Sequence, residues 1–326
     1  MVVIVSCHHF PDDERIYHKQ IKSLSKTKNK ILYFTRSNSN LNLSSDSITH
    51  INLSIKLKLS DYIHRILNHL KSMQDVQQVQ IHEVDLLPLL KRIKYISPST
   101  FTIYDVHENM EALYRTFSNR KKFIRELLIR IRNYNENRYL KYVDHVILAN
   151  RPMFHDKYEN QSSTIIENFP KLEYLVPLED IKKRNKSNIL YHGHLGLERG
   201  LKDLVLAMEI VTDSIRDASL SIVGTFRTKD FETEIKGLIK NLKLQDSINI
   251  CSQVPHSDIW EVISNHKVGV IPFRMTPLTL ENTPTKLFEM MICGLEIVVS
   301  KLPPAQHFID NSVYWCEPGN IQSISR

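Results

Sequence analysis

Two carboxylates and a lysine stand close together in "ENTPTKLFEMMICG", the segment of residues 281–294. Glu281 and Glu289 lie on either side of a Thr-Pro-Thr turn that leads to Lys286. Carboxylates accept hydrogen bonds from hydroxyl groups, and an ammonium binds phosphate. Two glutamates at this spacing also arise by chance in a chain rich in glutamate. The proline and lysine between them raise the segment above a chance pair.

A strand-like run, "KVGVIPF", precedes this turn, and a helical pattern follows it. We predict that Thr283 caps the helix and that Pro284 takes its first position, where no N–H is needed. The free amides of Thr285 and Lys286 then point out of the helix N-terminus and favour phosphate. With a carboxylate on each side, this phosphate site fits a nucleotide-sugar, whose diphosphate lies between a ribose and a hexose. We assign Leu287 to the same ligand.

The motif and several other stretches resemble the retaining glycosyltransferases of family 4, which have the GT-B fold. "TPTKLFEMMICGLEIVVS" is similar to the family's E-x7-E region, in which P-x-K-x-x-E precedes a glycine and an apolar strand. The other similar stretches are "CHHFPDDERIYHKQIKSL", "IYDVHE", "ILYHGHLGLERGLKDLVLA" and "LSIVG". The resemblance covers nearly the whole chain. It implies two Rossmann-like domains, each a doubly wound parallel sheet, that face a central cleft.

The resemblance also implies roles for single residues. Glu289 corresponds to the family's ribose ligand, and Glu281 to the carboxylate that contacts the transferred hexose. Lys286 and Arg199 correspond to diphosphate ligands, and Gly193 lets the backbone approach the phosphate. Arg199 also fits a solvated charge at a helix entry. These groups would stabilise the charge that builds up on the leaving diphosphate.

Two positions depart from the family pattern. Many members have arginine directly after the strand glycine, where this chain has His194. A neutral imidazole is a poorer phosphate partner than a guanidinium. The loop after the first strand reads "SCHHFPDDER" and lacks the two glycines that many members carry.

His107 ends the strand with the Asp-x-His-Glu pattern. The resemblance places this histidine against the donor sugar, and the alternative is a structural histidine bonded to a backbone carbonyl. Asp105 and Glu108 are expected to orient loops.

The loop after the first strand holds further polar residues. We expect His8, His9 and Asp13 to face the acceptor or the donor, and Asp12 and Glu14 to cap the following helix.

Short apolar runs alternate with amphipathic stretches along the chain, which predicts α/β domains with parallel sheets. In the first half, the expected strands are Val2–Cys7, Lys30–Thr35, Val79–His82, Phe101–Asp105 and His145–Ala149, and a helix is expected over Glu14–Ser25. In the second half, the expected strands are Asn188–His192, Leu220–Val223, Ile248–Cys251, Val268–Ile271 and Glu296–Val299. The expected helices there are Leu201–Val211, Phe231–Asn241, Ser257–Asn265 and Thr285–Cys293.

These elements divide into two domains. We assign residues 1–167 to an N-terminal acceptor-side domain and residues 168–326 to a C-terminal domain that binds the nucleotide-sugar donor. The irregular stretch 168–186 is the expected linker. The chain ends in "EPGNIQSISR", a loop and the first turn of a helix, so we expect the second domain to be truncated.

The composition is that of a globular protein: 42% of the 326 residues are hydrophobic and 24% are charged. The sequence has no secretory signal pattern and no apolar run near the ~20 residues that span a bilayer. The four cysteines are far apart, which indicates free thiols in a reducing cytoplasm and no zinc. No Asp-x-Asp motif is present, so neither a metal nor another cofactor is expected.

Positive charge is concentrated in the first half. Residues 1–170 carry 25 Lys and Arg against 17 Asp and Glu, whereas residues 171–326 carry 18 against 19. Residues 120–143 form a predicted helix with eight basic residues and two glutamates, and residues 55–71 are similar. The basic face is either a solvated surface or a contact with an anionic membrane. Basic and aromatic residues do not interleave as nucleic-acid binding requires. The apolar stripe expected to dock the longer helix is Ile124, Leu127, Leu128 and Ile131.

The sequence therefore predicts a retaining glycosyltransferase that moves a hexose from a nucleotide-sugar, with UDP favoured, to a glycan or lipid-linked acceptor. We expect it to work in cell-envelope polysaccharide synthesis, in the cytoplasm or at the inner face of the cell membrane. The alternatives are an inactive GT-B subunit that binds a nucleotide-sugar or a partner, and a GT-B sugar-nucleotide epimerase.

Overall fold

The computed structural model describes residues 1–73, 75–150, 156–182, 184 and 187–326. The chain divides into two compact units, Met1–Asn168 and Phe169–Arg326. Each unit contains one parallel sheet with helices between its strands, which confirms the predicted α/β fold class. Part of the expected linker, residues 183, 185 and 186, lies outside the described residues.

The first unit has a seven-stranded sheet in the order β3-β2-β1-β4-β5-β6-β7. Its strands are β1 (Val2–Val5), β2 (Ile31–Arg36), β3 (Ile48–Leu53), β4 (Gln78–Ile81), β5 (Phe101–Val106), β6 (His145–Leu148) and β7 (Ser163–Ile165). Its helices are η1 (Glu14–Ile21), α1 (Lys22–Leu24), α2 (Leu59–Lys71), η2 (Val84–Leu86), α3 (Leu87–Ile96), α4 (Met110–Phe117), α5 (Lys122–Leu140) and η4 (Asp156–Tyr158).

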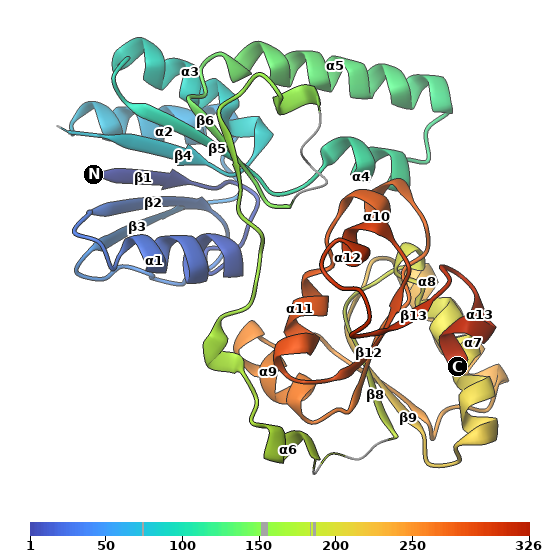
Figure 1. The fold of residues 1–326 in the computed structure, drawn as a ribbon. Coiled ribbons are helices and arrows are strands. Elements are labelled where there is room, and N and C mark those ends of the chain that lie inside the picture. Colours follow the sequence, from blue (N-terminus) through green and yellow to red (C-terminus); the bar gives the residue numbers. More distant parts are fainter. Residues whose placement is uncertain (74, 151–155, 183, 185–186) are drawn as a thin grey trace. The chain divides into compact units, whose positions relative to one another are not determined.

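Helices cover both faces of this sheet, with η1 and α1 on one face and α2, α3 and α5 on the other (Figure 1). Alternate residues of β1 explain this arrangement. Ile4 packs against Ile16 and Ile21 of η1, whereas Val5 belongs to the core that α2 and α3 complete. Because successive side chains of a strand point to opposite faces, an unbroken apolar run is buried on both sides.

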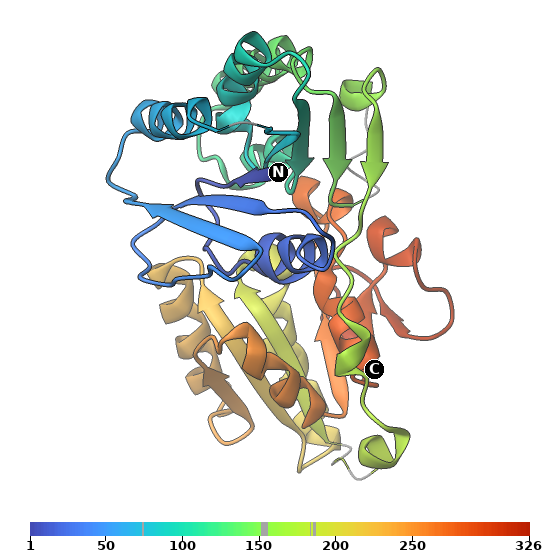
Figure 2. The same cartoon turned by 90° about the vertical axis from the view of Figure 1, so that its left-hand side faces the viewer.

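The second unit has a six-stranded sheet in the order β10-β9-β8-β11-β12-β13, and its strands run side by side in Figure 2. The strands are β8 (Asn188–Leu195), β9 (Ser219–Phe226), β10 (Ile248–Cys251), β11 (Val268–Ile271), β12 (Glu296–Ser300) and β13 (Tyr314–Cys316). The helices are η5 (Leu172–Tyr174), α6 (Leu178–Lys182), η6 (Leu197–Arg199), α7 (Leu201–Ser214), α8 (Lys229–Asn241), α9 (His256–Ser264), α10 (Pro277–Glu281), α11 (Thr285–Ile292), α12 (Pro303–Gln306) and α13 (Ile321–Ser325).

Two cores cover the faces of this second sheet. Helices α7, α8 and α13 pack on one face, and α9, α11 and α12 pack on the other. In both units the strand order reverses direction next to the first strand, between β1 and β4 and between β8 and β11. Ligands of open parallel sheets bind at the carboxyl ends of the strands on either side of such a point.

The sequence analysis did not predict strands β3, β7 and β13. Each lies at or near an edge of its sheet, and β3 and β7 contain mostly half-exposed or exposed residues. Edge strands bury little apolar surface, so they lack the continuous apolar run that marked the central strands.

The predicted docking stripe of α5 is wrong. Leu127 and Ile131 are exposed, whereas Ile129, Glu136 and Leu140 are buried. The neighbouring elements determine which face of the helix is buried. A pattern of apolar residues cannot predict this face where one of its buried residues is a glutamate. Arg132 of the predicted basic face is half-buried.

Candidate active site

Gly193 lies near the carboxyl end of β8, next to the point where the strand order of the second sheet reverses. Its φ is +108°, and a Cβ at this position would lie 2.7 Å from Nζ of Lys286. A side chain here would be strained and would displace the lysine. Gly193 and Lys286, predicted as one site, are therefore adjacent in the structure.

The ammonium of Lys286 is held within the second unit. It donates a hydrogen bond to the His192 carbonyl at 2.5 Å and lies 4.8 Å from the centre of the Tyr191 ring and 5.4 Å from that of Phe273. Burial and then the nearby positive charge of Arg199 lower the pKa of Lys286 to about 7. An anion bound here would favour the protonated form again.

Glu289 lies one turn further along α11 than Lys286 and faces the same strand end. Its Oε2 lies 3.6 Å from Nε2 of His192, which is buried. The structure thus brings Glu289, Lys286 and Gly193 together around the end of β8. Glu281 is the last residue of α10 and is half-buried.

Arg199 belongs to a cluster of charges after β8. Its Nε lies 3.4 Å from Oε1 of Glu198, and its guanidinium lies 4.6 Å from the centre of the Phe273 ring, which Lys286 also faces. The buried Glu198 accepts a 2.8 Å hydrogen bond from Nε of Arg227 as well. Two arginines thus share one carboxylate beside the lysine, which makes this edge of the second unit suitable for an anion.

His194 is the residue that departs from the family pattern. Partial burial lowers the pKa of its imidazole, and the positive charges of Arg227, Arg199 and Lys286 lower it further. His194 therefore adds no full positive charge to this cluster at neutral pH.

The start of α11 differs from the prediction. Pro284 is the N-cap residue and Thr285 is the first helical residue, and the side chain of Thr283 makes no capping bond. The Leu287 amide donates to the Pro284 carbonyl, and the Leu287 side chain is buried in the core. Within the described chain, the amides of Thr285 and Lys286 have no acceptor. They remain the free donors of this helix N-terminus.

In the first unit, the carboxylate of Glu83 accepts several hydrogen bonds from the loop that follows β1. Its Oε1 accepts hydrogen bonds from the Ser6 hydroxyl at 2.7 Å and, each at 2.9 Å, from the amides of Cys7 and His8 and from Nδ1 of His9. Burial alone would raise the pKa of Glu83, but these bonds, above all the one from His9, lower it to about 2. The carboxylate therefore fixes the loop and orients His9.

His107 lies against two buried polar residues at the ends of β4 and β5. Its Nε2 is 2.8 Å from Nδ1 of His82 and 3.3 Å from Oδ2 of Asp105. Burial lowers the pKa of His82, so this ring is neutral near pH 7. The backbone-bonded alternative for His107 does not describe these contacts, because its ring nitrogen faces two side chains. The ring of His107 also lies 4.7 Å from that of His9.

Asp105 is anchored by two residues of η1. Arg15 donates to its Oδ1 at 3.0 Å, and Gln20 donates to its Oδ2 at 2.5 Å. Asp105 is fully buried, and its pKa is held well below the usual range, despite burial, by the neighbouring His107 and Arg15. Asp105 therefore orients the histidines as well as the helix that carries Arg15.

His82, Asp105 and His107 also have the composition of a metal site, because their ligand atoms all lie within 4.8 Å of one another. Arg15 and Gln20 already bond the carboxylate, and the two rings bond each other. These partners make a hydrogen-bond network the better description.

Asp13 has a different place from the one predicted. Its carboxylate accepts the amides of Arg15 and Ile16, so Asp13 itself caps η1 in place of Asp12 or Glu14. His8 is exposed, and its Nε2 lies 3.3 Å from Oδ2 of Asp85. Glu108 is exposed as well.

Sequence reasoning missed four buried polar residues of these clusters: His82, Glu83, His192 and Glu198. His82 and Glu83 directly follow β4, the neighbour of the first strand β1, whereas His192 lies near the end of β8, the first strand of the second sheet, and Glu198 follows it closely. This position was the one available signal, because the partners of these residues are far away in the sequence.

Comparison with known proteins gives a family for most of the second unit. Residues 179–326 match the family model described as "Glycosyl transferases group 1". No curated protein sequence is similar enough to the chain to count as a match.

Solved structures resemble the whole chain. Sucrose-phosphate synthase from Thermosynechococcus elongatus has a TM-score of 0.76 at 16% identity, over 99% of this chain and 87% of that one. Anabaena HepE in complex with UDP has a TM-score of 0.72 at 14% identity, with the same coverage. A trehalose-phosphate synthase from Burkholderia xenovorans, in complex with glucose-6-phosphate, has a TM-score of 0.70 at 11% identity, over 100% and 90%.

No described helix has the length and apolar character needed to cross a bilayer. The second unit therefore matches the group 1 glycosyl transferases over most of its length, and the two parallel-sheet units and the structural neighbours show that the chain has the GT-B fold.

Proposed function

We propose that the second unit binds a UDP-sugar and that the enzyme transfers its hexose with retention of configuration, as members of glycosyltransferase family 4 do. The cluster of Gly193, Lys286, Arg199 and Glu289 carries this proposal. Its cations and the free amides of Thr285 and Lys286 suit a diphosphate, and Glu289 suits the ribose hydroxyls. The UDP in the Anabaena HepE structure supports the choice of nucleotide.

In this reaction the bond between the sugar and the diphosphate breaks, and negative charge builds up on the leaving phosphate. Lys286, Arg199 and the helix amides would stabilise that charge. The leaving phosphate would help to take the proton of the acceptor hydroxyl, on the same face of the sugar. Glu281 and His107 are the proposed contacts of the transferred hexose.

The acceptor proposed here is a lipid-linked glycan or lipid in cell-envelope polysaccharide synthesis. Basic residues of the first unit support this choice, because Arg120, Lys121, Lys122, Arg130 and Arg138 are exposed on or beside α5. Such a surface is attracted to the anionic inner face of a cell membrane, where the enzyme would act as a peripheral protein.

The decisive experiment measures binding and turnover of UDP-, GDP- and ADP-sugars by the purified chain. A UDP-sugar should raise the melting temperature, because a ligand that binds only the folded state stabilises it. Glu289→Gln should raise the KM for the donor about tenfold or more, by removing a charge-assisted hydrogen bond. Glu296→Gln, on an exposed residue of β12, is the control.

Three outcomes would contradict the proposal. Donor binding without any transfer or hydrolysis would favour an inactive subunit, and interconversion of the sugar without an acceptor would favour an epimerase. Loss of transfer on adding a chelator would contradict a mechanism without a metal.

A further inference from the structure

The first unit contains a half-open cavity of about 350 Å³, lined by residues of η2, α3, α4 and α5. Its volume is in the range of small-molecule sites. Asp85 follows the end of β4 and Met110 follows the end of β5, and both line the cavity. The cavity therefore lies at the edge of the sheet that carries Glu83 and His107, and it belongs to neither cluster described above.

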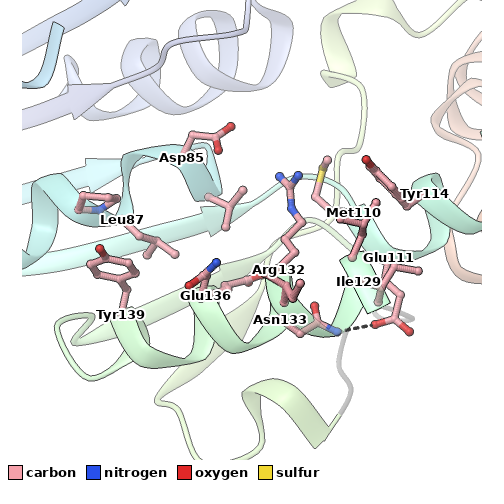
Figure 3. Close-up of a pocket in the computed structure, with 15 residues that line it drawn as sticks. Asp85, Leu87, Met110, Glu111, Tyr114, Ile129, Arg132, Asn133, Glu136 and Tyr139 are labelled. Atoms are coloured by element: carbon pink, nitrogen blue, oxygen red, sulfur yellow. Dashed lines mark hydrogen bonds between the residues drawn. The ribbon is translucent and has the colours of Figure 1, made fainter. Parts of the chain in front are cut away.

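The cavity wall is mostly apolar, with Leu87, Met110 and Leu128 among its residues. Figure 3 shows Arg132 extending away from α5 into the space that the lining helices enclose. The cavity thus combines a cationic head with a wall that is mostly apolar. Such a combination suits a ligand with both an anionic and an apolar part.

Within the described residues, none of the carboxylates that line the cavity pairs with Arg132, and each of them has another partner. The pairs are Asp85 with His8 at 3.3 Å, Glu111 with Arg115 at 2.8 Å, and Glu136 with the Tyr158 hydroxyl at 2.7 Å. Glu136 also accepts from Lys157.

Over the part of the chain that the structure describes, Arg132 makes no hydrogen bond or ion pair, and its Nε is buried without an acceptor. A buried donor without an acceptor is unfavourable, so an anion that reaches it is bound preferentially. The planar guanidinium matches phosphate oxygens in particular.

The outer side of α5 carries a stripe of exposed apolar residues beside this cavity. Phe123, Leu127, Ile131 and Tyr134 are 69%, 56%, 49% and 71% exposed and lie on one face of the helix. Ile131 also lines the cavity, so apolar surface continues from the cavity wall to the outside. The exposed Arg130 lies on the same outer side.

We propose that this cavity binds the phosphate group of an amphiphilic lipid acceptor, with Arg132 as the phosphate ligand and the exposed stripe of α5 in contact with the apolar chain. The inference rests on the proposed transfer to a lipid-linked acceptor and names the acceptor site. Both parts of the ligand are inferred from the molecule: the guanidinium, which has no partner among the described residues, suits the anion, and the continuous apolar surface suits the chain.

The test measures binding of farnesyl monophosphate to the full chain by calorimetry, below the concentration at which it forms micelles. Farnesol offers the same chain without the phosphate, and inorganic phosphate offers the anion alone. We expect farnesyl monophosphate to bind, and Arg132→Gln to weaken it about tenfold or more. Arg65→Gln makes the same chemical change at an exposed position of α2, away from the cavity and the stripe, and should leave binding unchanged.

Two further variants distinguish the loss of the binding site from a folding defect in Arg132→Gln. Leu127→Gln alters only the exposed stripe and should weaken farnesyl monophosphate without affecting the cavity. Arg132→Lys keeps the charge and should restore part of the affinity. Equal binding by the wild type and Arg132→Gln overturns the proposal. So does saturation by inorganic phosphate at the affinity of the lipid phosphate, which would indicate a site for a free phosphate compound.

Binding of UDP to the same proteins separates this inference from the proposed function. Arg132→Gln should bind UDP as the wild type does, because the UDP ligands belong to the second unit. If the protein binds farnesyl monophosphate through Arg132 but does not bind UDP, the proposed lipid site stands and the proposed UDP-sugar donor is contradicted. If the protein binds UDP but does not bind farnesyl monophosphate through Arg132, only the proposed lipid site is contradicted.

Discussion

The two units share a strand order but carry opposite chemistry at the carboxyl ends of their first strands. At the ends of β1 and of the neighbouring strands β4 and β5, the first unit has buried carboxylates and imidazoles, centred on Glu83 and Asp105. At the end of β8 the second unit has cations, Lys286 and Arg199, over aromatic rings. The backbone topology thus determines where a site forms, and the loops after the strands determine which charge it binds.

The largest expected effect is a loss of stability on replacing Glu83, whose carboxylate bonds only groups of the first unit. Glu83→Gln removes a buried charge that four groups share, so the first unit should lose about 3 kcal/mol of unfolding free energy. Its carboxylate has a lowered pKa, so its stabilisation is present above the ordinary carboxyl pKa and is lost as the pH falls toward about 2. Denaturant unfolding of both proteins at pH 7 measures the loss.

Asp85→Asn is the control for Glu83, because the side chain of Asp85 is 46% exposed and its contact is with an exposed histidine. It should cost less than about 1 kcal/mol. The same loss in both variants would mean that the buried carboxylate has no special part in the first unit.

The second expected effect is weaker binding of UDP, which tests whether the cations of the second unit bind a ligand. Lys286→Met should weaken UDP about a hundredfold, because a charge-assisted bond to phosphate is worth up to about 3 kcal/mol. Uridine, which has no phosphate, should bind both proteins alike. Lys202→Met removes a more exposed lysine that pairs with Glu234 and is the control. Unchanged UDP binding by Lys286→Met would show that the diphosphate binds elsewhere.

The third effect follows from the pKa of Lys286, which is about 7 in the free protein. At pH 8 most of its side chains are neutral. A bound diphosphate raises the pKa, so UDP binding should take up to about one proton from the buffer. Calorimetry in buffers of different ionisation enthalpy measures the number. Uptake should disappear in Lys286→Met and at pH 5.5, where the lysine is already protonated; uptake that persists in the variant would assign it to another group.

The smallest effect concerns the outer surface of the first unit. The double variant of Arg130→Glu and Arg138→Glu should float less with anionic vesicles, since each basic residue near such a surface contributes about 1 kcal/mol. Binding should also fall between 0.1 and 1 M salt, as the screening length falls from about 10 Å to about 3 Å. Arg216→Glu with Lys240→Glu makes the same charge change on exposed residues of the second unit. Equal loss in both double variants would indicate an effect of net charge alone.

Sequence patterns predicted the central strands and long helices, because burial on both sides of a parallel sheet leaves an apolar run that can be read directly. They also brought Gly193, Lys286 and Glu289 into one hypothesis, and these three lie together in the structure. The cap of α11 was wrong because Thr283 and Pro284 are both buried, and packing outweighed capping preference there.

The buried polar network of the first unit could not be predicted. Glu83 bonds residues more than seventy positions away in the sequence, and Arg15 bonds Asp105 across ninety. Such pairs leave no local pattern. The face of α5 that packs inward was misjudged for a related reason, since Glu136 is buried through its bonds to Lys157 and Tyr158.

A backbone carbonyl of β8 already accepts the hydrogen bond of the lysine proposed to hold the leaving diphosphate. When a nucleoside diphosphate dissociates, the ammonium of Lys286 can return to the His192 carbonyl instead of remaining bare among aromatic rings. This return stabilises the ligand-free state, so the carbonyl competes with the diphosphate for the lysine and lowers the affinity for the product. Because the acceptor is a main-chain group, no substitution of the side chain at position 192 removes this competition.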